Sequence, residues 1–278
     1  TLNDMEPFTG GCHHSFTCHK FESDCSHCPQ LTSTMFSNNA RKYLDIKKRS
    51  VKKVRNISIV GVSSWITELS KNSSLFKNYE THTIHNSVDT NIFNPSALKD
   101  NKIIKLLFVA DDFTRFNKGL DLLEDSLNAI SNKSKYELHL VGNNTDKVKE
   151  LSVKTIKHGY INKIENLVEL YSKSHITIVP SRYESFNQTV IESMACGTPV
   201  VAFDNSGPSR LIDHKQNGYL AEAFKPYSFK DGIEFLSEQY QVDNKLQENC
   251  ISKVQKEFTS EKQSSEYIKL YDKILSVN

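Results

Sequence analysis

The sequence predicts an α/β fold with a doubly wound parallel sheet, and three observations lead to it. Short apolar runs alternate with segments of helical periodicity between residues 103 and 203, as in a parallel sheet covered by helices on both faces. The run at 103–110 is almost wholly apolar, as expected of a strand buried on both sides. A length of 278 residues is enough for two ordinary domains.

The first 90 residues contain the elements of only part of a domain. Residues 1–31 show little periodicity and are expected to be irregular, whereas 32–53 is polar and basic and favours a helix followed by a charged turn. Apolar runs at 57–60 and 81–85 predict two strands. Ser63 or Ser64 can cap a helix that begins at Trp65.

The second part, after an Asn-rich linker at 86–95, supplies the full alternation. Strands are predicted at 103–110, 137–141, 155–158, 175–179 and 199–203. Helices are predicted at 120–130, 146–151, 164–174, before Gly197, and at 229–239, 244–257 and 261–275. We therefore divide the chain into a partial first domain (1–90), a Rossmann domain (91–258) and a C-terminal helix (259–278) expected to pack back on the first domain.

Two glutamates eight positions apart, Glu184 and Glu192, mark a candidate site. Glu184 follows a predicted strand and Glu192 lies in the next helix, at the sheet edge where open α/β sheets bind ligands. The predicted helix N-terminus at Ser185, Phe186 and Asn187 would offer N–H groups and a positive dipole to a diphosphate. Ionised carboxylates accept hydrogen bonds from sugar and ribose hydroxyls, so the pattern predicts a nucleotide-sugar site.

The surrounding residues, Pro-Ser-x-x-Glu-Ser-Phe and Glu-Ser-Met-Ala-Cys-Gly-Thr-Pro-Val-Val, resemble the Glu-x7-Glu signature of retaining glycosyltransferases with two Rossmann domains (GT-B type), in particular family 4. The resemblance runs from about Asp4 to Tyr219. It implies that Glu184 orients the donor sugar and Glu192 holds the ribose hydroxyls. It also implies direct front-face transfer with retention, without a catalytic metal.

A basic loop after the first strand of the second part extends the candidate site. Lys118 precedes Gly119, and Arg115 lies three residues earlier. Lys118 could meet a diphosphate as a point charge and Arg115 in bidentate fashion, although the family more often spaces these two residues further apart. The alternative is a solvated basic loop.

Two strand-ending segments also resemble parts of the family's nucleotide site. Gly142 stands where a glycine lets the nucleotide approach. Gly159 and Tyr160 stand in the segment whose backbone holds the base. Each segment is explained as well by an ordinary turn.

Four cysteines, Cys12, Cys18, Cys25 and Cys28, lie in the segment 10–31 in the pattern Cys-x5-Cys-x6-Cys-x2-Cys. The final Cys-x2-Cys has metal-ligand spacing, so structural zinc, disulfides and buried free thiols are all open. A similar segment occurs in a branch of these transferases that acts on bacterial exopolysaccharide, capsule and lipopolysaccharide.

Two features put catalysis by this chain in doubt. Asn3 replaces a His that in this branch lies near the reacting sugar, and Glu6 replaces a Trp. About a hundred residues of a complete first domain are expected to be missing before Thr1. The expected function is therefore glycosyl transfer from a UDP- or GDP-sugar to a glycan or lipid-linked acceptor. The alternatives are an inactive nucleotide-sugar-binding fragment and a nucleotide-sugar epimerase.

Charge and composition limit the classes of partner that the protein is expected to bind. The 35 basic and 33 acidic residues nearly balance, which disfavours nucleic acid as a partner. No run of 18 apolar residues predicts a membrane span. Without a visible signal peptide, we expect a cytoplasmic protein with peripheral association at the inner face of a membrane.

Overall fold

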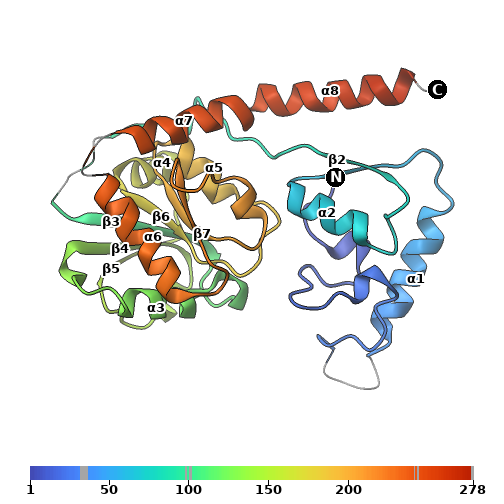
Figure 1. Cartoon of the computed structure of the whole chain (residues 1–278), viewed down its shortest axis with the longest axis horizontal. Helices are drawn as coiled ribbons and strands as arrows, with labels where there is room; N and C mark the ends of the chain where they lie inside the picture. Colours follow the sequence, from blue (N-terminus) through green and yellow to red (C-terminus); the bar gives the residue numbers. More distant parts are fainter. Residues whose placement is uncertain (32–36, 98, 100–101, 241, 243, 277–278) are drawn as a thin grey trace. The chain divides into compact units, whose positions relative to one another are not determined.

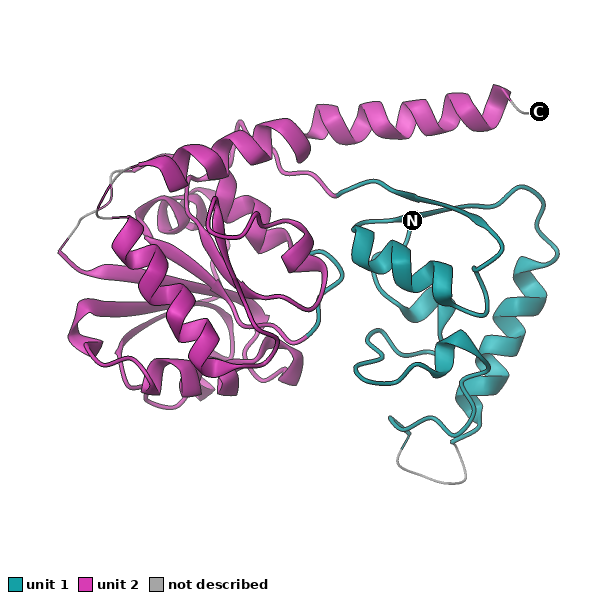
Figure 2. Cartoon of the chain, in the orientation of Figure 1, with its two compact units in different colours: residues 1–85, 183–186 teal, residues 86–182, 187–278 magenta. Residues whose placement is uncertain are grey.

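The structure is a computed structural model that describes residues 1–276 except 32–36, 98, 100–101, 241 and 243. Contacts divide the chain into two compact units (Figure 2). Unit 1 comprises residues 1–85 and 183–186, and unit 2 comprises 86–182 and 187–278. The passage between them at 85–86 lies close to the predicted boundary at residue 90, and the C-terminal helix is counted with unit 2.

Unit 1 begins with an irregular segment, as predicted, and continues with short regular elements. Its 3-10 helices, α-helices and strands are Glu6–Phe8, Lys20–Glu22, α1 (Asn39–Val51), β1 (Ser58–Gly61), α2 (Ser64–Asn72) and β2 (Glu80–Thr83). β1 and β2 pair in parallel. The Ser63 side chain accepts a hydrogen bond from the Ile66 N–H at 3.3 Å, which confirms the predicted helix cap.

Aromatic side chains form the core of unit 1 and explain why its irregular start is ordered. Phe8 and Phe21 are almost fully buried, and their ring centroids lie 5.9 Å apart in an edge-to-face arrangement. Phe8 also meets Phe76 at 6.3 Å. Large buried rings dominate core energetics, so these contacts anchor the two 3-10 helices on the α/β part of the unit.

Unit 2 contains a six-stranded parallel sheet of order β5-β4-β3-β6-β7-β8 (Figure 1). Its strands are β3 (Ile104–Asp112), β4 (Tyr136–Asn143), β5 (Lys154–Gly159), β6 (Ile176–Val179), β7 (Val200–Phe203) and β8 (Gly218–Ala221). Its α-helices are α3 (Leu120–Asn128), α4 (Ile164–Lys173), α5 (Gln188–Ala195), α6 (Pro226–Gln239), α7 (Lys245–Glu257) and α8 (Ser260–Ser276). Its 3-10 turns are Phe116–Lys118, Lys133–Lys135, Thr145–Lys147 and Gly207–Arg210.

Helices cover the sheet in two layers, so the predicted doubly wound α/β class is confirmed. α3 packs beside α6, and α4 packs beside α5 (Figure 1). Leu123 and Leu127 of α3 join Ile233 of α6 in one buried cluster with the strands. These leucines lie four positions apart on one helical face, which is why the sequence reveals this layer well.

Two parts of unit 2 differ from the prediction. The helix expected at 146–151 is wrong: only the 3-10 turn Thr145–Lys147 forms there. Val148, Leu151 and Val153 are all buried, but the chain that carries them is irregular, with bends at 152 and 153 before β5. Strand β8 was not predicted; it has only four residues and begins with Gly218, a residue type that is depleted in strands.

A polar cluster lies on β4 and β5. His139 Nε2 donates to Glu137 Oε1 at 2.9 Å, and His139 Nδ1 lies 2.8 Å from His158 Nε2. Lys154 pairs with the other oxygen of Glu137 at 2.5 Å. Burial lowers the pKa of both histidines, so this cluster is a neutral-histidine arrangement at pH 7.

None of the helices in the described part of the chain is both long enough and apolar enough to span a bilayer.

Candidate functional site

The strand order reverses direction between β3 and β6. From β3 the chain proceeds outward through β4 and β5, then returns to β6 on the other side of β3 and proceeds to β8. Open α/β sheets bind ligands beyond the carboxyl ends of the strands at such a switch point. The loops that follow β3 and β6, which carry most of the predicted site residues, both begin at this point.

The loop after β3 carries both predicted cations. Arg115 Nη1 lies 2.7 Å from Asp111 Oδ2, and Lys118 Nζ lies 3.1 Å from Asp111 Oδ1. Asp111 at the end of β3 therefore ties the two cations together, a role that sequence reasoning missed. The Lys118 side chain is only 15% exposed and that of Arg115 is 60% exposed, so Lys118 is the more enclosed of the two.

Gly119 determines how closely this loop approaches β6. It is left-handed, with φ 71° and ψ 31°. A Cβ at this position would lie 2.0 Å from the Pro180 carbonyl oxygen. Gly119 therefore packs closely against Pro180, the first residue after β6. Only glycine can adopt the left-handed conformation and also allow this close approach.

Glu192 projects from α5 and is largely buried. The Tyr171 hydroxyl of α4 donates to Glu192 Oε2 at 3.0 Å. Burial raises the pKa of Glu192, and the hydrogen bond from Tyr171 partly opposes this. Tyr171 is fully buried, so it fixes one carboxylate oxygen in place. Sequence reasoning missed Tyr171, because it looks like an ordinary core residue of an amphipathic helix.

The helix that contains Glu192 begins later than predicted. α5 starts at Gln188, with Asn187 as its N-cap residue at φ 84°. The N–H groups of its first turn therefore belong to Gln188 and Thr189, and not to Ser185 and Phe186 as expected. Asn187, in its positive-φ conformation, turns the chain into the helix.

The segment with Glu184 is grouped by its contacts with unit 1. The Ser63 hydroxyl donates to the Ser185 carbonyl oxygen, and the Phe186 ring lies 5.9 Å from that of His85. Glu184 itself is half-buried. The roles of Glu184, Ser185 and Phe186 in donor binding stay predictions.

The two strand-ending glycines differ in what they require. Gly142 has φ 142°, and a Cβ there would lie 1.7 Å from the Ala110 carbonyl oxygen, so close strand packing already explains this glycine. Gly159 has φ 68° with open space beside it. The chain after Gly159 borders a shallow hollow, lined by His158, Tyr160, Ile161, Asn162, Lys163, Asn166, Glu169 and Leu170.

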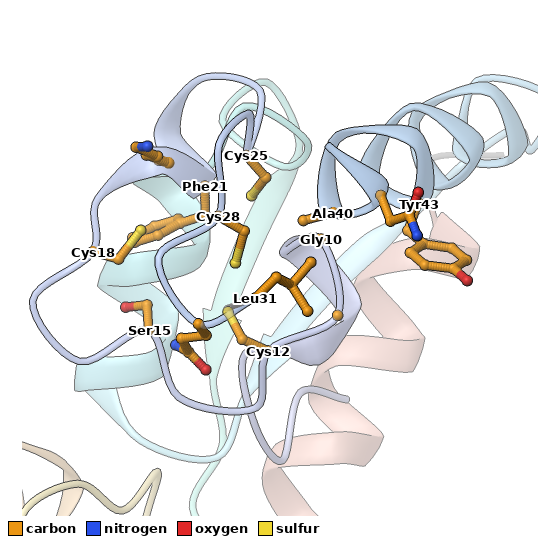
Figure 3. A pocket seen from close by; sticks show the side chains of 14 residues that line it. Gly10, Cys12, Ser15, Cys18, Phe21, Cys25, Cys28, Leu31, Ala40 and Tyr43 are labelled. Atoms are coloured by element: carbon orange, nitrogen blue, oxygen red, sulfur yellow. The ribbon is translucent and has the colours of Figure 1, made fainter. Parts of the chain in front are cut away.

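The four N-terminal cysteines line a single cavity of about 530 Å³ in unit 1 (Figure 3). All four are free thiols. Burial raises the pKa of the Cys25 thiol to about 11, and the neighbouring cysteines add to the shift. Four thiols suit zinc as a donor set, yet no three His, Cys, Asp or Glu among the described residues are arranged to hold an ion. The donors fit zinc, and their positions would have to shift to bind it.

Comparison with known proteins now identifies the class. Residues 89–257, more than half of the chain, match the family Glycosyl transferases group 1, and the chain belongs to this family. It is 27% identical over 199 residues to a probable sucrose-phosphate synthase of Thermosipho melanesiensis, which covers 67% of this chain and 46% of the relative. It is 25% identical over 211 residues to the N-acetyl-alpha-D-glucosaminyl L-malate synthase of Bacillus anthracis, which covers 71% of this chain and 55% of the relative. The chain thus spans about half the length of these curated relatives.

Solved structures confirm the GT-B fold class. The sucrose-phosphate synthase of Thermosynechococcus elongatus superposes with a TM-score of 0.72 at 21% identity, over 90% of this chain and 65% of that one. The Anabaena protein HepE, solved in complex with UDP-glucose, superposes with a TM-score of 0.68 at 17% identity, over 84% and 68% of the two chains.

Proposed function

We propose that this chain supplies the donor-binding part of a retaining glycosyltransferase that takes a sugar from a nucleotide diphosphate sugar. The observation that carries the proposal is the loop at the switch point of unit 2, where Lys118 and Arg115 meet Asp111 inside the segment that matches the family. The complex of HepE with UDP-glucose favours a UDP-sugar over a GDP-sugar as the donor.

The residues of unit 2 divide the work of binding the nucleotide. Lys118 and Arg115 balance the charge of the diphosphate, with the N–H groups of Gln188 and Thr189 as additional donors. Glu192, fixed by Tyr171, accepts hydrogen bonds from the ribose hydroxyls. The chain around Gly159 and Tyr160 lies along the hollow that would take the base.

Transfer would proceed with retention by front-face substitution. The bond from the sugar carbon to the diphosphate oxygen breaks while the acceptor oxygen attacks from the same side, and the acceptor proton passes to the departing phosphate oxygen. Glu184 orients the donor sugar in this scheme. Because cations and helix N–H groups stabilise the leaving diphosphate, the transfer step needs no metal ion. We propose a growing polysaccharide or a lipid-linked oligosaccharide as the acceptor.

The cysteine segment is assigned a structural role. Its four thiols belong to unit 1 and line a cavity with apolar residues such as Phe21 and Leu31. Four thiolates on one ion would leave no open position for chemistry. If zinc is bound there, its contribution is to the folding of the irregular start of the chain.

Calorimetric titration of the chain with UDP and with GDP tests the proposal. We expect UDP to bind and Lys118→Ala to weaken it roughly 10–150-fold, the loss of a hydrogen bond to a charged group worth ~1.5–3 kcal/mol. Lys230→Gln, which removes an ion pair on α6, is the matched control. A folded chain that binds neither nucleotide would refute the donor-site assignment.

The same preparation separates the alternatives. Binding of UDP-sugar with release of free UDP when acceptor glycans are added supports transfer. Binding without turnover supports a binding protein, in line with Asn3 in place of the family's His. Conversion of the bound sugar without an acceptor would identify an epimerase.

A further inference from the structure

Arg182, three residues beyond β6, joins the loop after β6 to the loop after β3. Its backbone N–H donates to the Asn117 carbonyl oxygen at 2.7 Å. Its Nη1 donates to the Phe116 carbonyl oxygen at 2.9 Å. Both acceptors belong to the 3-10 turn Phe116–Lys118, which ends in the lysine proposed to bind the diphosphate.

The Arg182 side chain is held on two further sides. Its guanidinium forms a bidentate pair with Asp121 in the first turn of α3, with Nη1 2.8 Å from Oδ1 and Nη2 2.5 Å from Oδ2. The guanidinium carbon also lies 3.9 Å from the centre of the Phe116 ring. Bidentate pairing and stacking are contacts that Arg makes and Lys cannot reproduce.

Arg182 also reaches the loop after β7, because its carbonyl oxygen accepts a hydrogen bond from the Asn205 side-chain amide. Three loops at the carboxyl edge of the sheet therefore meet at one residue. The Arg182 side chain is only 12% exposed, and three of its donor hydrogens are engaged by Phe116 and Asp121. This geometry suits a fixed structural link better than a mobile charge reaching for a ligand.

We propose that Arg182 is a positioning residue that holds the Phe116–Lys118 turn, and with it Lys118, in the conformation that receives the diphosphate. The inference rests on the proposed function for its consequence in binding, but the clamp itself is a property of the protein alone. Arg182 acts through the loop and does not touch the ligand.

The clamp is tested first without any ligand, by hydrogen exchange of the full chain. The Lys118 and Gly119 N–H groups are bonded within the loop, to the carbonyl oxygens of Arg115 and Phe116. We expect Arg182→Gln to speed their exchange by at least about tenfold, equal to ~1.4 kcal/mol of local opening. Asp121→Asn should act in the same direction, and Lys230→Gln on α6 should have no effect. Unchanged exchange in a folded Arg182→Gln protein would overturn the proposal.

The consequence for binding is tested with UDP and uridine on the same variants. Arg182→Gln and Arg182→Lys should both weaken UDP by about tenfold, ~1.4 kcal/mol, and leave uridine unchanged, because only the diphosphate meets the loop. In a Lys118→Ala background, Arg182→Gln should add nothing further. If Arg182 instead contacted the diphosphate directly, the results would differ. Arg182→Lys would keep most of the affinity for UDP, and Arg182→Gln would weaken UDP binding in the Lys118→Ala background too.

The two experiments also separate failure of the inference from failure of the proposed function. Absence of UDP binding by the unmodified chain, together with faster exchange in Arg182→Gln, would retain the clamp and reject the donor site. Normal UDP binding by the unmodified chain, together with unchanged exchange in Arg182→Gln, would reject the clamp and retain the donor site.

Discussion

Replacing Glu192 by Gln tests the ribose assignment at the residue whose environment is best defined. The substitution keeps the size of the side chain and a partner for the Tyr171 hydroxyl, which donates to Glu192 Oε2 at 3.0 Å. Alanine would be a poorer choice. It would leave the buried Tyr171 hydroxyl without its acceptor, at a cost of about 1–3 kcal/mol of stability.

The expected magnitude follows from the charge on the acceptor. A hydrogen bond to an ionised group contributes ~1.5–3 kcal/mol and one between neutral groups ~0.5–1.5 kcal/mol. Loss of even one ribose bond to Glu192 therefore predicts that the unmodified chain binds UDP about 10–150-fold more tightly than 2′,3′-dideoxy-UDP. In Glu192→Gln this ratio should fall to roughly 2–13-fold.

Calorimetry with the two nucleotides gives the ratio directly, and the ratio cancels any general effect on the diphosphate. Glu234→Gln, at an ion-paired glutamate on α6, is the control and should keep the full discrimination. Burial raises the pKa of Glu192, so the discrimination should fade on acidification at a higher pH than for an exposed glutamate. Equal discrimination in the unmodified chain and in Glu192→Gln would refute the ribose role.

Three further predictions follow from particular contacts. Gly119→Ala should lower UDP affinity and thermal stability, measured by calorimetry and by melting, because its Cβ would meet the Pro180 carbonyl oxygen at 2.0 Å; an unchanged melting temperature would contradict the close approach. The pKa of His139 is lowered in the folded chain, so the unfolded state takes up more protons below about pH 6.5. The free energy of unfolding should therefore fall as pH drops below that value. His139→Gln should flatten its dependence on pH between about pH 5 and 7, measured by urea unfolding. Equal slopes in the unmodified chain and in His139→Gln would contradict a lowered pKa of His139. If the four cysteines hold zinc, metal analysis should give about one ion per chain, Cys25→Ser should lose it, and Cys196→Ser should keep it.

The fold was predictable from the sequence where burial leaves a local pattern. β3 is central in the sheet and is mostly buried from Ile104 to Ala110, and this part of its sequence is accordingly almost all apolar. Leu123 and Leu127 give α3 a helical period for the same reason. The pattern failed at 146–151, where Val148 and Leu151 are buried by an irregular segment, and at β8, where Gly218 starts a strand that follows a turn.

In the candidate site, too, local patterns revealed some residues and the fold was needed to find the others. Lys118 and Glu192 could be proposed from the sequence because each stands in a local motif: Lys118 precedes Gly119 in the loop after β3, and Glu192 lies in the α5 helix. Their partners could not, because Tyr171 and Arg182 make their contacts across 21 and 61 residues of chain. Such contacts depend on which strands are neighbours, and the adjacency of β3 and β6 is what brings Arg182 to Asp121. A tyrosine in a helix and an arginine after a strand look ordinary until the strand order is known. The sequence alone therefore led to the prediction of the nucleotide-binding residues, whereas the side chains that contact Glu192 and the Phe116–Lys118 turn could be found only from the fold.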